Sequence, residues 1–199
     1  MSGANIDVND LSVARNGATE LDRLSFKLPA GETLTVLGDE ASGKEALLRV
    51  LGGFAARAEE ISGTIRYGDS PALPAAKRGK APIRIVYLAG AAEAPLNPYT
   101  GVAAQLARVV GRRHGSPRAS AAEELRMALE RFPEAPAFAA LSKKPGELTA
   151  IDLSWALLAA AMAQAPDLLI ADHAFADLTP TSIKTLVAAL SAEQKRLGR

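Results

Sequence analysis

The sequence VLGDEASGKEALLRVLGG, residues Val36–Gly53, has two glycines separated by four residues and followed by a lysine. Gly38, Gly43 and Lys44 fit the pattern G-x-x-x-x-G-K-[ST], but Glu45 stands where the final hydroxyl belongs. In that pattern backbone N–H groups cradle phosphate oxygens, the lysine reaches the β- and γ-phosphates, and the hydroxyl binds Mg²⁺. The stretch therefore predicts a phosphate-binding loop with an altered metal ligand.

The acidic residues of this loop bear on how well it binds a nucleotide. A carboxylate can ligate Mg²⁺, so Glu45 is a candidate metal ligand. However, Asp39, Glu40 and Glu45 surround a site for an anion. A unit charge about 4 Å from a phosphate costs about 4 kcal/mol at an effective dielectric near 20. We therefore expect weakened nucleotide binding. The alternative is a glycine-rich turn that binds nothing. The candidate nucleotide contacts are Gly38, Ala41, Ser42, Gly43, Lys44 and Glu45.

The flanks of the loop supply the context that a phosphate loop needs. Thr33–Gly38 reads as a buried strand that runs into the loop, and Ala46–Leu51 reads as a helix that leaves it. Upstream, alternating apolar residues over 5–15 and 21–28 predict two strands of a half-exposed sheet, joined by a turn at Asn16–Gly17. These elements predict an N-terminal antiparallel β subdomain.

The rest of the chain alternates strands and helices. We expect strands over Gly63–Gly68, Ile83–Gly90 and Asp167–Asp172, and helices over Ile151–Gln164 and Pro180–Leu197. The Ala-rich region 100–142 predicts helices interrupted at Gly111–Pro117 and Phe132–Pro136. Together these elements predict one α/β domain over residues 1–199, with a mixed sheet and a helical insert near residues 96–150.

Composition narrows the function classes. The 199 residues are 48% apolar and 23% charged, which indicates a globular chain long enough to bury a core. A net charge of +1 argues against a nucleic-acid binder that relies on a basic surface. The absence of cysteine excludes disulfides and thiolate chemistry. The N-terminus lacks a signal-peptide pattern, and the most apolar stretch, Trp155–Ala165, is too short to cross a bilayer. We expect a cytoplasmic protein that reaches a membrane only through a partner.

A second motif supports a nucleotide site. The strand DLLIAD ends at Asp172, and Leu148 lies 24 residues upstream. The ungapped run from Glu147 to Leu178 resembles the ATP-binding subunits of ABC transporters, in which a signature Leu-Ser-Gly-Gly-Gln leads into a helix, a proline and the Walker B strand. Pro95–Pro98 resembles the Ser-Leu-Asn-Pro run of the dipeptide, oligopeptide and nickel importer branch. The resemblance implies a P-loop fold of the ABC type, ATP and Mg²⁺ as ligands, and Asp172 beside the metal.

The resemblance also exposes departures from the family's motifs. The water-polarising glutamate after Walker B is His173, and the glutamine that links the γ-phosphate to the helical region falls at or near Gly90. His173 is a doubtful catalytic base, because imidazole is shorter than glutamate and partly cationic near pH 6.5. The stretch SVARNGATEL lacks the aromatic that stacks on adenine. Together these departures imply weakened or lost hydrolysis. The signature positions are occupied by Leu148, Thr149, Ala150, Ile151 and Asp152.

Three functions remain open. The first is the ATP-binding subunit of an importer of peptides or a related solute, paired with a second such subunit beneath transmembrane permease subunits at the inner membrane. The second is a non-hydrolysing scaffold that pairs with an intact ABC ATPase. The third, a P-loop kinase or GTPase, is disfavoured because those families lack the helix-then-Walker-B register. The sequence ends at KRLGR, before the family's switch-histidine strand, so we expect a C-terminally incomplete domain. We expect no nucleic-acid partner.

Overall fold

The computed structural model describes residues 4–39, 41–54, 58–76, 81–91, 94–114 and 117–196, with the backbone alone at Arg113, His114 and Arg118. The chain forms two compact units, one of Met1–Ile85 with Glu193–Arg199 and one of Val86–Ala192. The single domain with a helical insert near residues 96–150 stays a prediction.

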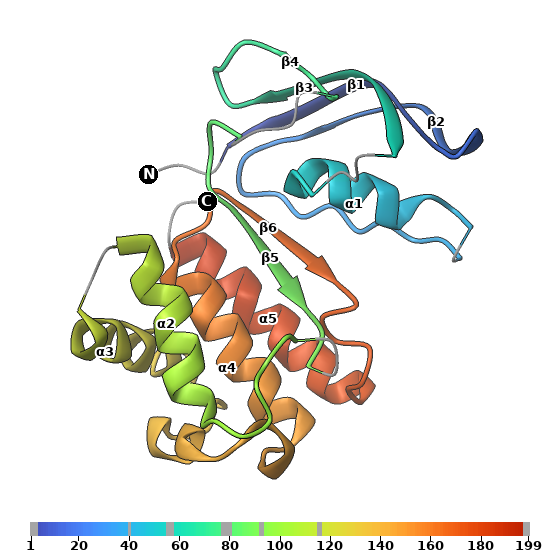
Figure 1. Ribbon diagram of the computed structural model, residues 1–199. Coiled ribbons are helices and arrows are strands. Elements are labelled where there is room, and N and C mark those ends of the chain that lie inside the picture. The colour runs from blue at the N-terminus through green and yellow to red at the C-terminus, as the bar shows by residue number, and fades with distance from the viewer. Residues whose placement is uncertain are drawn as a thin grey trace. The chain divides into compact units, whose positions relative to one another are not determined.

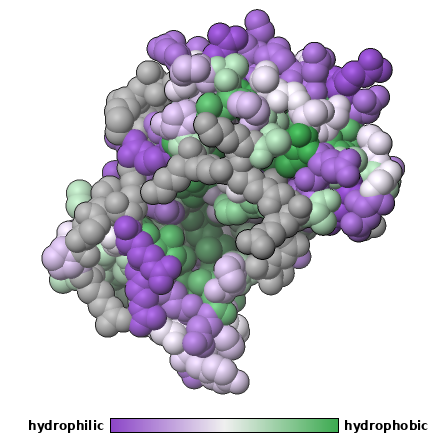
Figure 2. All heavy atoms as spheres, turned by 45° about the horizontal axis from the view of Figure 1, so that its top comes forward, coloured by the Kyte–Doolittle hydropathy of each residue, from purple (hydrophilic) through white to green (hydrophobic). Residues whose placement is uncertain are grey.

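The first unit is built on a four-stranded antiparallel sheet with the strand order β2-β1-β3-β4 (Figure 1). Ile6 and Val8 of β1 are buried, as are Leu11 and Val13 beyond a register shift, and hydrophilic side chains gather over the outer surface of this unit (Figure 2). The two predicted N-terminal strands and their turn at Asn16–Gly17 are therefore confirmed. The strands are β1 (Ile6–Arg15), β2 (Ala18–Leu28), β3 (Glu59–Tyr67) and β4 (Leu73–Pro74).

Helix α1 (Lys44–Gly52) follows the glycine loop and lies along one face of this sheet (Figure 1). Its buried residues recur at the spacing of one helical face, as an amphipathic helix against a core requires. This confirms the helix predicted after the loop. The buried residues are Ala46, Leu47, Val50 and Leu51.

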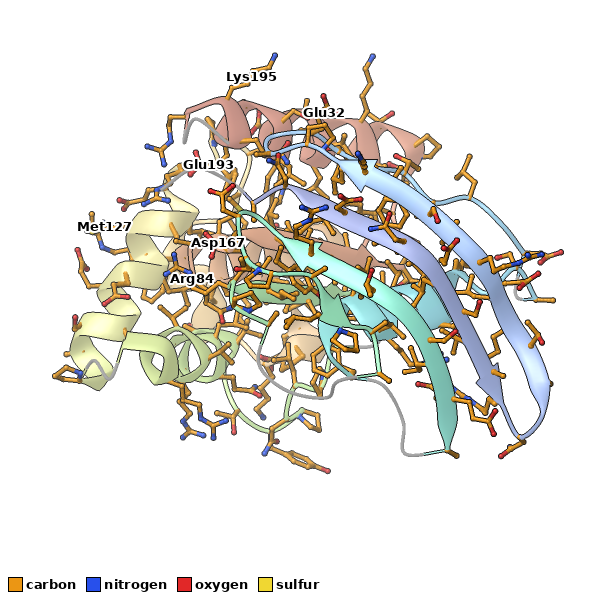
Figure 3. The ribbon with its side chains drawn as sticks, turned by 90° about the horizontal axis from the view of Figure 1, so that it is seen from above. Glu32, Arg84, Met127, Asp167, Glu193 and Lys195 are labelled. Atoms are coloured by element: carbon orange, nitrogen blue, oxygen red, sulfur yellow. The ribbon has the colours of Figure 1, made fainter. Side chains whose placement is uncertain are left out.

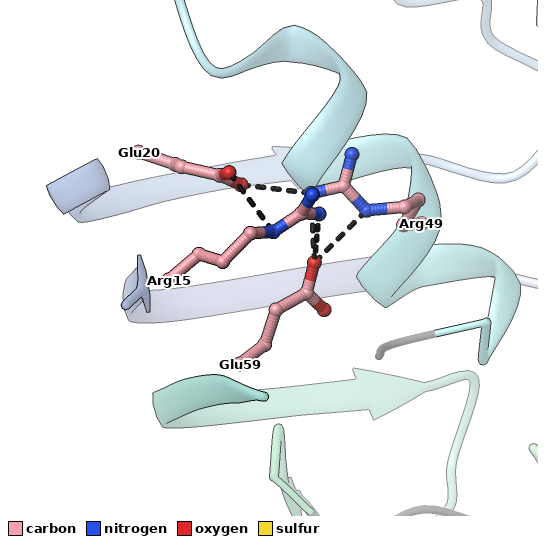
Figure 4. Close-up of polar contacts among 4 residues, drawn as sticks. All are labelled: Arg15, Glu20, Arg49 and Glu59. Atoms are coloured by element: carbon pink, nitrogen blue, oxygen red, sulfur yellow. Dashed lines mark hydrogen bonds and ion pairs between the residues drawn. The ribbon is translucent and has the colours of Figure 1, made fainter. Parts of the chain in front are cut away.

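A cluster of four charged residues ties α1 to the sheet (Figure 4). The Glu59 side chain, with 0% exposure, accepts hydrogen bonds from Arg15 Nη2 at 2.6 Å and from Arg49 Nη2 and Nε at 2.8 and 3.0 Å. Glu20 accepts from Arg49 Nη2 at 2.7 Å and lies 3.2 Å from Arg15 Nε. The hydrogen bond to Glu59 is the main cause that raises the pKa of Arg15. The four side chains come from β1, β2, β3 and α1, so the cluster joins every large element of the unit.

The strand predicted over Thr33–Gly38 is wrong. These residues have no strand hydrogen bonds, and Leu34, Val36 and Leu37 are 46%, 37% and 88% exposed. A strand exists through its hydrogen bonds to a neighbour, so β-branched and apolar residues alone do not make one. The predicted pairing of this segment with Asp167–Asp172 would join residues of the two units and stays a prediction.

The second unit contains the strand pair β5 (Ile85–Ala89) and β6 (Leu168–Asp172) and a set of helices. The predicted strands over 83–90 and 167–172 and the helices over 151–164 and 180–197 are confirmed, within a few residues at their ends. The helices are α2 (Val102–His114), α3 (Arg118–Leu129), α4 (Ala150–Ala163) and α5 (Pro180–Arg196), with 3₁₀ turns at Phe138–Ser142 and Pro145–Glu147.

The core of this unit surrounds α4, which is buried on nearly every side. Trp155 is 1% exposed, and its ring centroid lies 5.5 Å from that of Phe132. The helix α2 continues through residues 111–114, where the sequence predicted a break. A single glycine in a helix costs only about 1 kcal/mol, so Gly111 does not end it.

We expect Glu59→Gln to lower the free energy of unfolding by about 2–4 kcal/mol, because the change removes the charge of a fully buried carboxylate that two part-exposed guanidinium groups contact. Urea unfolding of the full chain measures it. The matched control is Glu60→Gln on the same strand, whose side chain is exposed. Equal effects of the two changes would show that the cluster adds nothing.

Candidate nucleotide-binding site

The glycine loop leads into α1 as the motif predicts. Gly43 is the residue that caps α1, at φ 78°, a left-handed conformation that glycine adopts without strain. A Cβ at this position would lie 2.1 Å from the carbonyl oxygen of Glu20. The backbone conformation and the close approach of β2 therefore both require glycine here.

Several hydrogen-bond donors of the loop bond to oxygens of Asp39. Its carbonyl oxygen accepts from Lys44 Nζ at 2.8 Å, and from Ser42 Oγ and N at 2.7 and 3.2 Å. Its carboxylate Oδ1 accepts from Ala41 N at 3.1 Å. Oxygens of Asp39 thus occupy donors that the motif offers to a phosphate. A bound phosphate would have to displace them. Glu40, the other acid predicted to surround the site, lies outside the described residues.

Glu45 is exposed in the first turn of α1. An acid at this place interacts favourably with the helix dipole. Its charge also contributes to the raised pKa of Arg15. Glu45 therefore has favourable interactions within the chain that do not depend on a metal.

Among the described residues no group of three or more histidine and acidic side chains is placed to hold a metal ion. Glu45 and Asp172 would each have to act as a single ligand, which suits Mg²⁺, because this ion keeps several waters and binds phosphate oxygens. Glu45 and Lys44 belong to the first unit and Asp172 to the second. The predicted closeness of Lys44 to Asp172 therefore stays a prediction.

The carboxylate of Asp172, at the end of β6, is held within the second unit. Its side chain is 20% exposed. Oδ2 accepts a hydrogen bond from the phenol of Tyr87 on β5, and Oδ1 lies 4.0 Å from His173 Nε2. Sequence reasoning missed Tyr87, because the sequence of a single strand does not determine its register against a neighbouring strand.

The ends of β5 and β6 also meet at Gly90 and His173. A Cβ on Gly90 would lie 2.6 Å from the carbonyl oxygen of His173. His173 has φ 47°, an uncommon conformation for a residue other than glycine, and its side chain is 48% exposed. The structure thus brings together Gly90, Asp172 and His173, which the sequence assigned to one site.

The signature residues form the start of α4. Thr149 caps the helix: its hydroxyl accepts from Asp152 N at 3.2 Å and donates to Asp152 Oδ2 at 2.7 Å. Leu148 precedes this cap, and Ala150 and Ile151 begin the helix. The hydroxyl at the signature's serine position is therefore used by the chain itself, beside a carboxylate at the helix N-terminus.

The Pro95–Pro98 run is fixed to α2. Gln105 accepts from Asn97 N at 2.7 Å and donates to the carbonyl oxygens of Asn97 and Thr100 at 2.9 and 2.7 Å. These three hydrogen bonds of the Gln105 side-chain amide connect the run to α2.

A cavity of about 400 Å³ lies in the first unit, apart from these motifs. Of residues 38–39 and 41–45, which the structure describes, none lines it, so the cavity is separate from the described part of the phosphate loop. Its lining includes Val50, Leu51, Ile65, Tyr67, Leu73 and Ile83.

We expect Gly90→Ala to lower the free energy of unfolding by about 1–3 kcal/mol, because the new Cβ would overlap the His173 carbonyl and force the backbone apart. The matched control is Gly146→Ala in the same unit, where an added Cβ meets nothing within 4 Å. Urea unfolding of both variants measures the difference. A Gly90→Ala variant as stable as its control would show that the two strand ends are not held together.

Comparison with known proteins identifies the family. The ABC transporter family matches residues 21–176. The oligopeptide transport ATP-binding protein OppD of Salmonella typhimurium is 29% identical over 198 residues, 96% of this chain and 59% of the relative. The intermembrane phospholipid transport system ATP-binding protein MlaF of Escherichia coli K12 is 28% identical over 97% of this chain and 70% of the relative. The phosphonates import ATP-binding protein PhnC 1 of Haloquadratum walsbyi is 25% identical over 84% of this chain and 53% of the relative. This chain thus spans about three fifths of the length of OppD. The predicted P-loop fold class is confirmed, and the chain belongs to the ATP-binding domains of ABC transporters.

Proposed function

We propose that this chain is an ABC importer subunit with weakened ATP binding and weakened or lost hydrolysis. The observation that carries the proposal is the occupation of donors in both motifs by oxygens of the chain itself. Before α1, the backbone carbonyl of Asp39 accepts from Lys44 Nζ and its carboxylate accepts from Ala41 N. Before α4, the carboxylate of Asp152 accepts from the Thr149 hydroxyl. Both acids would repel a phosphate and must be displaced to admit one.

The residues of the loop still fit a nucleotide phosphate. Lys44 and the backbone N–H groups of residues 41–44 are the donors that would hold it. The family's domain binds ATP, typically with Mg²⁺. Bound Mg²⁺ would neutralise charge on the β- and γ-phosphates, with Glu45 and Asp172 as its protein ligands. The negative charges of Asp39 and Glu45 weaken the site without removing it.

Hydrolysis requires a group that orients water, and the chain has His173 where the family has glutamate. A neutral imidazole can act as a base, but His173 is half exposed and its backbone is in the left-handed region. The signature supplies no glycine pair, because Ala150 and Ile151 carry side chains at those positions. Both losses act against turnover.

The proposed solute class rests on the Pro95–Pro98 run, because the relatives are named for different solutes. OppD is named for oligopeptide transport, MlaF for phospholipid transport and PhnC 1 for phosphonate import. The Pro-Leu-Asn-Pro run favours peptides or a related solute. The proposed partners are transmembrane permease subunits and a second ATP-binding subunit, in a homo- or heterodimer.

Those partners would hold the chain at the cytoplasmic side of the inner membrane. Among the described helices none is both long and apolar enough to cross a bilayer.

A second candidate role is a non-hydrolysing scaffold that pairs with an intact ABC ATPase. The Thr149–Asp152 contact favours it, because a signature closed on itself offers little to a nucleotide on a partner subunit. In that role the partner would perform the hydrolysis.

We expect the chain alone to release phosphate from ATP at background rate. Losing one positioned general base lowers a rate by about 10²–10⁴-fold. Losing oriented donors lowers it by about 10²–10³-fold. His173→Glu alone should not restore turnover, since the signature would still be closed. A phosphate-release assay with Mg²⁺ measures this. Strong release by the unmodified chain, abolished by Lys44→Ala, would contradict the proposal.

We expect Glu45→Ser to tighten binding of a fluorescent ATP analogue by about 3–10-fold, because it removes a charge from an anion site and supplies the motif's hydroxyl. Fluorescence titration with Mg²⁺ measures the dissociation constant. The control is Glu32→Ser, the same change in the loop after β2 (Figure 3). Unchanged binding in Glu45→Ser would mean that another residue limits affinity.

A further inference from the structure

The contact between Tyr87 and Asp172 has no counterpart among the motifs. Tyr87 lies in the middle of β5, and Asp172 is the last residue of β6. The two strands are neighbours in one sheet and run in the same direction (Figure 1). The Tyr87 phenol donates a hydrogen bond to Asp172 Oδ2 across this pair. Hydrogen bonds from a hydroxyl to an ionised carboxylate are among the stronger ones in proteins.

We propose that Tyr87 positions the Asp172 carboxylate against β5 and so withholds Oδ2 from a magnesium ion or its bound water. The side chain of Asp172 is 20% exposed, so little solvent competes with the phenol. The other oxygen, Oδ1, faces His173 Nε2 at 4.0 Å. In this chain the aspartate joins two strands, and a metal must break or share that bond. The metal half of the inference rests on the proposed function, whereas the contact itself does not.

The backbone beside Asp172 reinforces this arrangement. The His173 carbonyl is so close to Gly90 that a Cβ there would lie 2.6 Å away, and the same carbonyl accepts from Ala176 N at 3.1 Å. The chain that follows Asp172 is therefore fixed to the end of β5. Reorienting the carboxylate then requires rotation of its own side chain, which breaks the hydrogen bond to Tyr87.

A double-mutant cycle on the full chain tests the contact without any nucleotide. We expect Tyr87→Phe and Asp172→Ala each to lower the urea midpoint, and the double variant to fall no further than the worse single variant. Coupling of this kind is the mark of two residues in direct contact. The control is Tyr99→Phe, which removes a phenol that is 82% exposed and should leave the midpoint unchanged. Additive effects of Tyr87→Phe and Asp172→Ala would overturn the inference.

The second measurement tests the metal. The affinity of a fluorescent ATP analogue is measured with excess Mg²⁺ and with EDTA, in the unmodified chain, Tyr87→Phe and Tyr99→Phe. We expect the ratio of the affinities with and without Mg²⁺ to rise about 3–10-fold in Tyr87→Phe, because the net free energy of one hydrogen bond corresponds to a factor of this size. In Tyr99→Phe this ratio should stay unchanged. An unchanged gain in Tyr87→Phe would overturn the withholding of Oδ2. Binding by no variant would overturn the proposed function, while a coupled cycle would still uphold the contact.

Discussion

The buried carboxylate of Glu59 is the constraint on which the first unit depends. A carboxylate with no exposed surface is stable only when cations and donors surround it, and Arg15 and Arg49 supply both. The planar guanidinium of Arg49 bonds Glu59 and Glu20 together, which a lysine could not do with the same geometry. Because Arg49 belongs to α1, the helix that follows the phosphate loop is fixed to the sheet by charge as well as by its apolar face. The loop therefore starts from a rigid support.

Acids in the first turns of two helices interact favourably with the helix dipoles. A negative charge is favoured at a helix N-terminus for the same reason that a phosphate is, since both are attracted by free N–H groups and the helix dipole. Glu45 lies in the first turn of α1, and Asp152 in that of α4. Each acid thus interacts with a helix N-terminus, the kind of position at which a phosphate also binds.

The sequence predicts those parts of the fold that are specified locally. The turn at Asn16–Gly17, the strand ending at Asp172 and the helix after Thr149 follow from turn residues, apolar runs and caps. Thr33–Gly38 has the composition of a strand but no strand partner among the described residues, so the strand predicted from its composition is wrong. The acceptor role of Asp39 and the contact of Tyr87 depend on loop closure and strand register. Neither is determined by residues adjacent in the sequence.

Gly90 and His173 lie far apart in the sequence but meet at the ends of β5 and β6. The His173 carbonyl occupies space that a side chain at position 90 would need, since a Cβ there would lie 2.6 Å from its oxygen. The backbone of His173 has φ 47°, which is itself uncommon for a residue with a Cβ. A side chain added at position 90 would have to push this backbone away, whereas a different side chain at position 173 would leave the carbonyl against Gly90. The backbone at position 173 therefore constrains which residues position 90 can hold.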